Sequence, residues 1–257
     1  LNFKLHLQYS CNTVLYKIFV WYKNYMSTFQ IINLQIKNFF DNFNHYLTIL
    51  VIPTIITVVS IVYVVPDIDY SFTYLLLSLL MIFLLIIFNY KAIVSIHRFV
   101  ILEEVPDLLN FKIKVTFSYA MYSILLAIIA FMPLLISVIL PFFENVSLSI
   151  ISIPLIIGSF IWMFIALPFL SLNLPLVAIG EKISFFEMWS KSKGFRLTLF
   201  LQLLLVSIAN WVFEFIATYI FQNNYLEIAV IVFQWFTFAI YISCISQTYL
   251  LWKNNKT

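Results

Sequence analysis

The chain has 257 residues, of which 63% are hydrophobic and only 10% are charged. A soluble globular protein is about 45–50% apolar and about 25% charged. The 14 Lys and Arg and the 11 Asp and Glu are therefore too few to cover a water-exposed surface. This composition excludes a soluble enzyme, a disordered chain and a nucleic-acid-binding domain, and it predicts a protein that lies largely in lipid.

Residues 1–25 precede the first methionine, Met26, which is followed by a segment typical of a helix start. The apolar part of residues 1–25 is too short to span a membrane, and no signal-peptide cleavage site follows it. We expect residues 1–25 to be upstream sequence or a dispensable extension. The alternative is an arm that lies on the membrane. Residues 26–257 form the predicted membrane domain.

Two segments that lead into the apolar runs below have the pattern of an amphipathic helix. Ser27–Gln30 and Ser184–Glu187 both fit a capping box, and Asp107–Lys114 is a weaker third case. We expect these helices to lie on the cytoplasmic membrane surface, although polar flanks are common to any membrane hairpin. After the first box, apolar residues follow helical spacing at Ile32, Ile36, Phe39, Phe43 and Leu47.

Six long, almost uncharged runs each have close to the ~20 residues that cross a bilayer as a helix. They are too continuously apolar for the alternating strands of a β-barrel. The sequence thus predicts an all-α polytopic protein with six transmembrane helices in three hairpins. Lys91 lies near the end of the second run, where its long stem can reach the interface. The runs are Tyr46–Val65, Phe72–Ile96, Val115–Leu140, Leu148–Leu170, Leu197–Phe221 and Leu226–Leu251.

The basic residues are distributed on one side of these six runs. All 14 Lys and Arg lie in or beside segments on the same side as the two termini, whereas the opposite loops contain only acidic charges. Because basic loops stay in the cytoplasm, we expect both termini to be cytoplasmic in a bacterial inner membrane. The opposite loops are residues 66–71, 141–147 and 222–225.

Rare residue types limit the chemistry. Gly158, Gly180 and Gly194 are the only glycines, so no phosphate-binding loop or dinucleotide fingerprint is present. Cys11 and Cys244 do not suggest a disulfide framework, and the three histidines lack metal-ligand spacing. We therefore expect no enzymatic activity, no cofactor and no metal.

Two segments predicted to be cytoplasmic carry a resemblance. They are His97–Pro106, directly after the second run, and Leu174–Lys182, which continues through Phe186–Ser192. With six spans, residues 26–252 resemble bacterial inner-membrane proteins related to the membrane domain of glycerophosphodiester phosphodiesterases. In fused relatives a separate soluble domain performs catalysis, so the resemblance implies a non-catalytic membrane domain. Relatives often carry an arginine where this chain has Ser171 and Asn173.

The charged and aromatic side chains of these segments are candidates for contact with lipid. Arginine suits a lipid phosphate because its guanidinium group binds phosphate in a bidentate manner. The alternative is a set of interfacial anchors balanced by nearby acids. The candidates are His97, Arg98, Glu104, Lys182, Trp189, Lys191 and Lys193.

The last two runs carry polar stripes at matching depths. We expect Glu214 to bond Gln234, Asn210 to pair with Thr237, and Ser207 to pair with Tyr241. Such a stripe either joins the two helices or serves as a proton or cation path. The sequence therefore predicts a non-enzymatic accessory module that binds membrane lipids or a protein partner, but no nucleic acid. The alternative is a transporter or channel that uses this stripe.

Overall fold

The computed structural model describes residues 28–60, 72–106, 112–143, 152–181, 194–221 and 225–254, and all secondary structure in these ranges is helical. A helix over Thr28–Asp41 comes first. It is followed by α2 (Phe43–Val59), α3 (Phe72–Leu102), α4 (Ile113–Phe143), α5 (Ser152–Ser171), α6 (Asn173–Ile179), α8 (Arg196–Phe215), the π-helical turn η2 (Ile216–Phe221) and α9 (Tyr225–Asn254). The described part of each predicted run is thus helical.

Four helices in the described ranges are long and apolar enough to cross a membrane. They cover residues 75–102, 113–136, 196–219 and 228–254. Thr28–Asp41 and α2 add a fifth if this pair, bent by 86°, counts as one span. The all-helical class predicted from composition is confirmed, and the described ranges hold four or five of the six predicted spans. Residues 61–71, 107–111, 144–151, 182–193 and 222–224 lie outside the described ranges.

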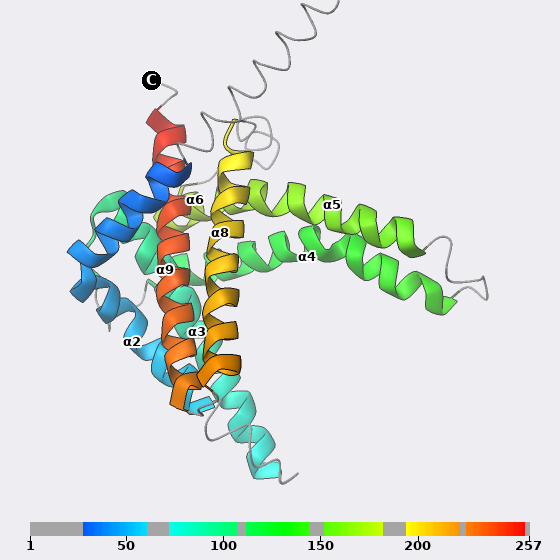
Figure 1. Cartoon of the computed structure of the whole chain (residues 1–257), viewed down its shortest axis with the longest axis horizontal. Coiled ribbons are helices and arrows are strands. Elements are labelled where there is room, and N and C mark those ends of the chain that lie inside the picture. The colour runs from blue at the N-terminus through cyan, green and yellow to red at the C-terminus, as the bar shows by residue number, and fades with distance from the viewer. Residues whose placement is uncertain are drawn as a thin grey trace, which may run out of the picture.

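Helix α9 is the centre of the bundle and lies between α2 and α8 (Figure 1). Hydrogen bonds join Tyr46 to Ser243 and Thr57 to Trp235, so α2 runs antiparallel to α9. Helix α8 is also antiparallel to α9, because its Gln202 bonds Thr248 while its Phe213 ring stacks on the Phe233 ring further down, at 4.0 Å.

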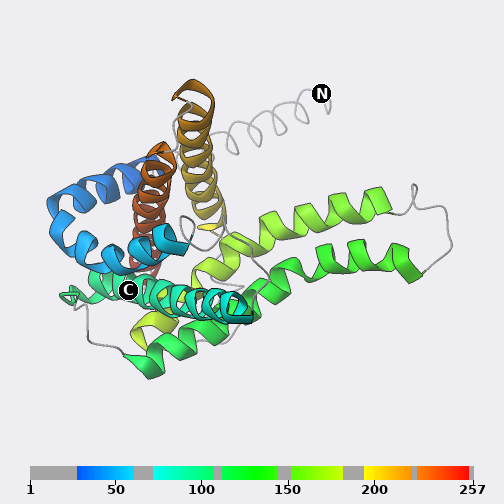
Figure 2. The same cartoon turned by 90° about the horizontal axis from the view of Figure 1, so that it is seen from below.

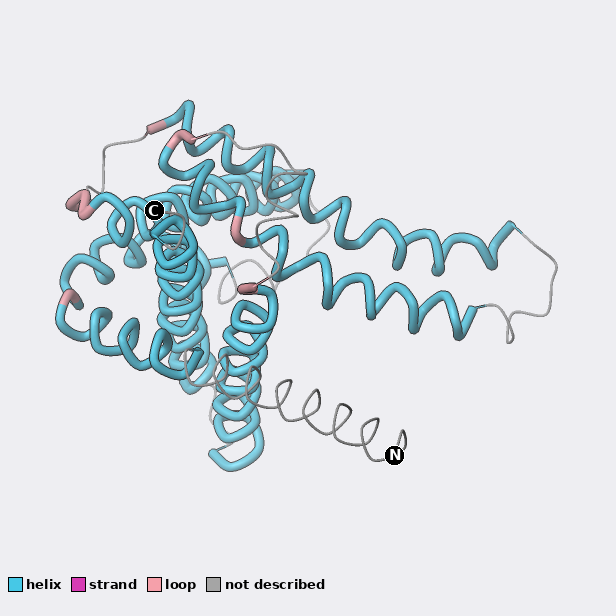
Figure 3. The backbone as a smooth tube through the Cα atoms, turned by 90° about the horizontal axis from the view of Figure 1, so that it is seen from above, coloured by secondary structure: helices cyan, strands magenta, loops and turns pink. Residues whose placement is uncertain are grey.

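The hairpin of α4 and α5 extends sideways from α3, α8 and α9 instead of running along them (Figures 1, 2 and 3). The Trp162 indole N–H donates to the Ile129 carbonyl at 3.2 Å and joins the two helices of the hairpin. Large apolar side chains such as Ile128 and Ile157 are exposed on it. This surface suits contact with lipid, where apolar exposure carries no hydrophobic cost.

The helix Thr28–Asp41 has a buried face, an exposed apolar face and a polar face. The apolar face that periodicity predicted is therefore divided: Phe39 packs against the Tyr46 and Phe236 rings, whereas Ile36 and Phe43 are exposed. Periodicity identifies apolar positions but does not distinguish contact with protein from contact with lipid. The buried face consists of Thr28, Ile31, Gln35 and Phe39, and the exposed apolar face of Phe29, Ile36 and Phe40.

Two helix ends place the residues of the site. Helix α6 stops at Gly180, whose φ of 84° needs glycine, and the N–H groups of Gly180 and Glu181 bond the carbonyls of Val177 and Leu176. Helix α3 stops at Glu103, which has a φ of 53° although it is not glycine.

Candidate functional site: a basic pocket at the end of helix α3

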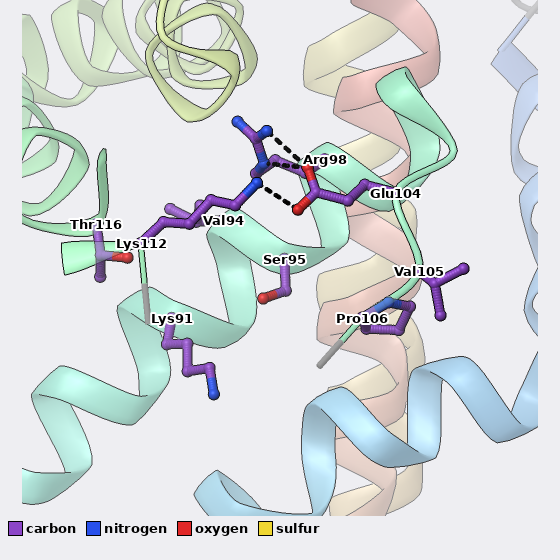
Figure 4. A pocket seen from close by; sticks show the side chains of 9 residues that line it. All are labelled: Lys91, Val94, Ser95, Arg98, Glu104, Val105, Pro106, Lys112 and Thr116. Atoms are coloured by element: carbon purple, nitrogen blue, oxygen red, sulfur yellow. Dashed lines mark hydrogen bonds and ion pairs between the residues drawn. The ribbon is translucent and has the colours of Figure 1, made fainter. Parts of the chain in front are cut away.

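The last turns of α3 line a small hollow, here called the basic pocket and defined by Lys91, Ser95, Arg98, Glu104, Lys112 and Thr116 (Figure 4). Lys91, Ser95 and Arg98 are spaced by four and three residues, so they share one face of α3. Glu104 follows the end of that helix. Lys112 and Thr116 come from the start of α4, one turn apart.

Arg98 binds two other segments of the chain at once. Its Nε and Nη2 atoms lie 2.8 and 2.6 Å from Oε2 of Glu104, and its Nη1 donates to the Ala178 carbonyl at 3.1 Å. Ala178 is in the last turn of α6, where carbonyls lack a partner within the helix. Arg98 therefore joins α3 to α6, so the segments His97–Pro106 and Leu174–Lys182 are in contact.

Glu104 is shared between two cations. Its other carboxylate oxygen pairs with the Lys112 ammonium group. Partial burial of Glu104 tends to raise its pKa, but the hydrogen bonds and charges of Lys112 and Arg98 outweigh this effect and hold the pKa below its ordinary value. Glu104 is thus a carboxylate at neutral pH, and it lies between the two cations Arg98 and Lys112.

Lys91 lies deeper, inside the apolar part of α3, and only 8% of it is exposed. It was expected to reach the interface, but it lines the basic pocket and a second hollow between α2 and α3, beside Ile49, Ile52 and Phe88. A cation in a membrane span is by default a functional candidate because its burial is costly. The two hollows share Lys91 and Ser95, so the charged side chains of the first lie next to the apolar side chains of the second.

His97 does not contact lipid, contrary to its place among the lipid candidates. The ring is fully buried between α9 and α4, with Nδ1 2.7 Å from Ser246 Oγ and Nε2 3.2 Å from the Tyr119 hydroxyl. Ser246 donates its own hydrogen to the Ile242 carbonyl. His97 therefore donates from Nδ1 and accepts at Nε2, so both ring nitrogens are satisfied.

Hydroxyls of α9 bond three neighbouring helices in the same way, and we call this set the polar belt. Each α9 hydroxyl donates to the carbonyl four residues earlier and can accept from a neighbouring helix. These bonds satisfy buried polar groups and fix the helices around α9. The pairs are Tyr46 with Ser243 at 2.9 Å, His97 with Ser246 at 2.7 Å and Gln202 with Thr248 at 3.0 Å.

The polar stripe predicted between the last two spans is formed only in part. Thr237 donates to Oδ1 of Asn210 at 2.6 Å, as expected. Glu214 and Gln234 are both exposed, and the described residues contain no hydrogen bond between them. The expectation of that bond is wrong because equal depth does not fix the direction in which two side chains point. Nor does a hydrogen bond join Ser207 to Tyr241 within the described ranges.

The other predicted lipid residues, Lys182, Trp189, Lys191 and Lys193, lie outside the described residues. Sequence reasoning missed Lys112 and Thr116 as parts of the pocket. It also missed most of the polar belt, although Ser243 and Ser246 have the three-residue spacing that places them on one side of α9.

No known protein family, curated protein or solved structure matches this chain. In the described ranges, no group of three His, Cys, Asp or Glu side chains is arranged to hold a metal ion. The basic pocket is therefore interpreted from its own geometry.

Proposed function

We propose that this chain is a non-enzymatic, multi-pass protein of a bacterial inner membrane that binds the phosphate of an anionic phospholipid in the basic pocket. It has six transmembrane helices in three hairpins, short helices on the cytoplasmic surface, and both termini in the cytoplasm. A relationship to the membrane domain of glycerophosphodiester phosphodiesterases is part of the proposal. The segments His97–Pro106 and Leu174–Lys182 are the basis of this relationship. The contact of Arg98 with the Ala178 carbonyl supports treating them as one unit.

The observation that carries the proposal is a group of basic side chains in a hollow between helices. Lys91, Arg98 and Lys112 line this hollow, and among the described residues the Glu104 carboxylate pairs with Arg98 and Lys112. Glu104 and the Ala178 carbonyl hold Arg98 in place, so the guanidinium charge is preorganised beside the pocket. Basic pockets between transmembrane helices are a recurrent way to bind anionic headgroups.

The surroundings of the pocket agree with a lipid ligand. Its cavity volume is only about 40 Å³, so the pocket takes part of a headgroup and leaves the rest of the lipid outside. The hydroxyls of Ser95 and Thr116 supply polar groups in its wall, and the adjoining hollow offers Ile49 and Ile52 to the apolar part of a lipid. A free inorganic phosphate would make no use of these apolar side chains.

The transporter alternative finds less support. Asn210 and Thr237 are bonded to each other, and Glu214 and Gln234 face outward instead of lining a path between helices. These contacts favour the joining of helices over ion or solute passage along α8 and α9.

Native mass spectrometry of the full chain with equal amounts of phosphatidylglycerol and phosphatidylcholine tests the proposal. We expect preferential retention of phosphatidylglycerol, and about tenfold weaker retention in Lys112→Gln because one charge-assisted contact is lost. Lys114→Gln is the matched control, since Lys114 is exposed and does not line the pocket. Equal retention of the two lipids, or equal effects of the two variants, contradicts the proposal.

A further inference from the structure

A third hollow, here called the terminal groove, lies between the helix Thr28–Asp41, the end of α3 and α9. Its cavity volume is about 580 Å³, and small-molecule sites are commonly about 300–1,000 Å³. None of its lining residues belongs to the basic pocket. It is therefore a separate place where a ligand of moderate size can bind.

The terminal groove is lined by charges of both signs. Asp41 and Glu103 place two carboxylates on its walls, and Lys37 places one ammonium group there. Lys37 and Asp41 are one turn apart on the same helix face, yet the described residues contain no ion pair between them. Neither carboxylate has a hydrogen-bond or ion-pair partner in the described part of the chain. All three charges remain available to a ligand.

Hydrogen bonds hold the wall of the groove in position. Asn42 Nδ2 donates to Oδ1 of Asn38 at 2.7 Å, and Asn38 Nδ2 donates to the Tyr46 hydroxyl at 3.4 Å. Tyr46 is part of the polar belt, so this wall is connected to α9. On the opposite side, the end of α3 offers Phe99 and Val100 as an apolar surface.

We propose that the terminal groove binds a phosphoethanolamine group, in which a primary ammonium lies two carbons from a phosphate. The Asp41 and Glu103 carboxylates accept hydrogen bonds from the ammonium, and Lys37 pairs with the phosphate. Phe99 and Val100 contact the apolar part of the ligand. A choline group fits less well because it has no N–H donors, and Phe99 is the one aromatic ring among the described lining residues.

The site is independent of the phosphate site in the basic pocket. The source of its ligand is either the headgroup of phosphatidylethanolamine or soluble phosphoethanolamine. Both share the same chemistry, and the experiment below distinguishes them.

The test is native mass spectrometry of the full chain with phosphatidylethanolamine, its N-methyl and N,N-dimethyl forms, and phosphatidylcholine of identical acyl chains. Retention should fall at each added methyl group because each removes one N–H donor. Glu103→Gln should weaken retention of phosphatidylethanolamine about tenfold. Glu214→Gln is the control, because it removes an exposed carboxylate far from the groove along α8 and should change nothing.

A second variant distinguishes the loss of the Glu103 carboxylate from a loss of folding. Glu103→Gly removes the carboxylate but suits the positive φ at this position, so the helix end is kept. It should lose phosphatidylethanolamine as Glu103→Gln does, with an unchanged or higher unfolding temperature. Lys112→Gln should leave phosphatidylethanolamine retention unchanged, which separates this site from the basic pocket.

Competition decides the source of the ligand. If soluble phosphoethanolamine displaces the lipid at similar concentration, the recognised group is correct and the ligand is the soluble compound. If only the lipid binds, the groove is a lipid site. Equal retention of phosphatidylethanolamine and phosphatidylcholine, or full retention in both Glu103 variants, overturns the proposal.

Discussion

The Nδ1 atom of His97 in α3 lies 2.7 Å from the Oγ atom of Ser246 in α9. Because Ser246 gives its hydrogen to the Ile242 carbonyl, this contact fixes which ring nitrogen of His97 carries the proton. Tyr119 then donates to the other nitrogen. A single neutral ring thus connects α3, α4 and α9 inside the bundle, where an unsatisfied polar group is costly.

We predict that His97 and Ser246 are energetically coupled. A double-mutant cycle with His97→Ala and Ser246→Ala should give a coupling free energy between about 0.6 and about 1.7 kcal/mol, the average and the maximum measured for hydrogen bonds between membrane helices. Reversible unfolding in detergent supplies the four free energies. Ser60→Ala is the control, since the Ser60 hydroxyl bonds only the Ile56 carbonyl of its own helix. Strict additivity of the two substitutions would show that the contact contributes nothing.

The lowered pKa of Glu104 predicts a pH-dependent stability. Above the ordinary carboxyl value of 4.5, Glu104 is ionised in both states, and its pairing with Arg98 and Lys112 stabilises the fold. As the pH falls from there through the lowered folded-state value, protonation removes this contribution. The unfolding temperature in detergent should therefore fall less steeply with acid in Glu104→Gln than in the natural chain. Parallel pH curves for the two proteins would contradict the role given to this pair.

Arg98→Lys should destabilise the junction of α3 and α6. A lysine has one nitrogen and cannot reach the two sides of the junction that Arg98 joins, Glu104 and the Ala178 carbonyl. We expect a loss of about 1–3 kcal/mol, the cost of a buried acceptor left without its donor. Lys114→Arg is the matched control and should lie within about 0.5 kcal/mol of the natural chain. A neutral Arg98→Lys substitution would mean that α6 is held by its other contacts alone.

The two acceptors of α8 should respond differently to substitution. Asn210→Leu removes the bond from Thr237 and should cost about 0.6–1.7 kcal/mol. Glu214→Gln and Glu214→Leu should both lie within about 0.5 kcal/mol of the natural chain, because Glu214 is exposed and has no described partner. Unfolding in detergent measures all three. A larger loss of unfolding free energy for Glu214→Leu than for Glu214→Gln would instead support the bond with Gln234 that the sequence predicted.

The orientation can be measured with reporter fusions. Alkaline phosphatase fused after Thr257 should be inactive, whereas a fusion in the loop 67–71 should be active, because the enzyme works only outside the cytoplasm. The expectation rests on the absence of Lys and Arg from the three loops opposite the termini. The reverse pattern of activities would invert the proposed topology.

Composition and periodicity by themselves determined the all-helical class of the protein and the approximate position of the helices in the described ranges. Runs of about 20 apolar residues must be helical in lipid, since only a helix satisfies every backbone group within one segment. The predicted run Leu197–Phe221 accordingly ends where η2 ends, at Phe221. The pairing of Asn210 with Thr237 was also predictable, because a short loop between two spans fixes their relative depth.

Only the tertiary structure decided which polar side chains meet and which face lipid. His97 and Arg98 are adjacent in sequence, yet the first enters the core and the second joins α6, because neighbouring residues of a helix point about 100° apart. Apolar periodicity gave Phe39 and Ile36 the same role, whereas packing buried one and exposed the other. Lys112 joined the pocket because Glu104, eight residues earlier, turns back toward it after α3 ends. Such contacts depend on the direction of a side chain and on the path of a loop, and neither is encoded in hydrophobic periodicity.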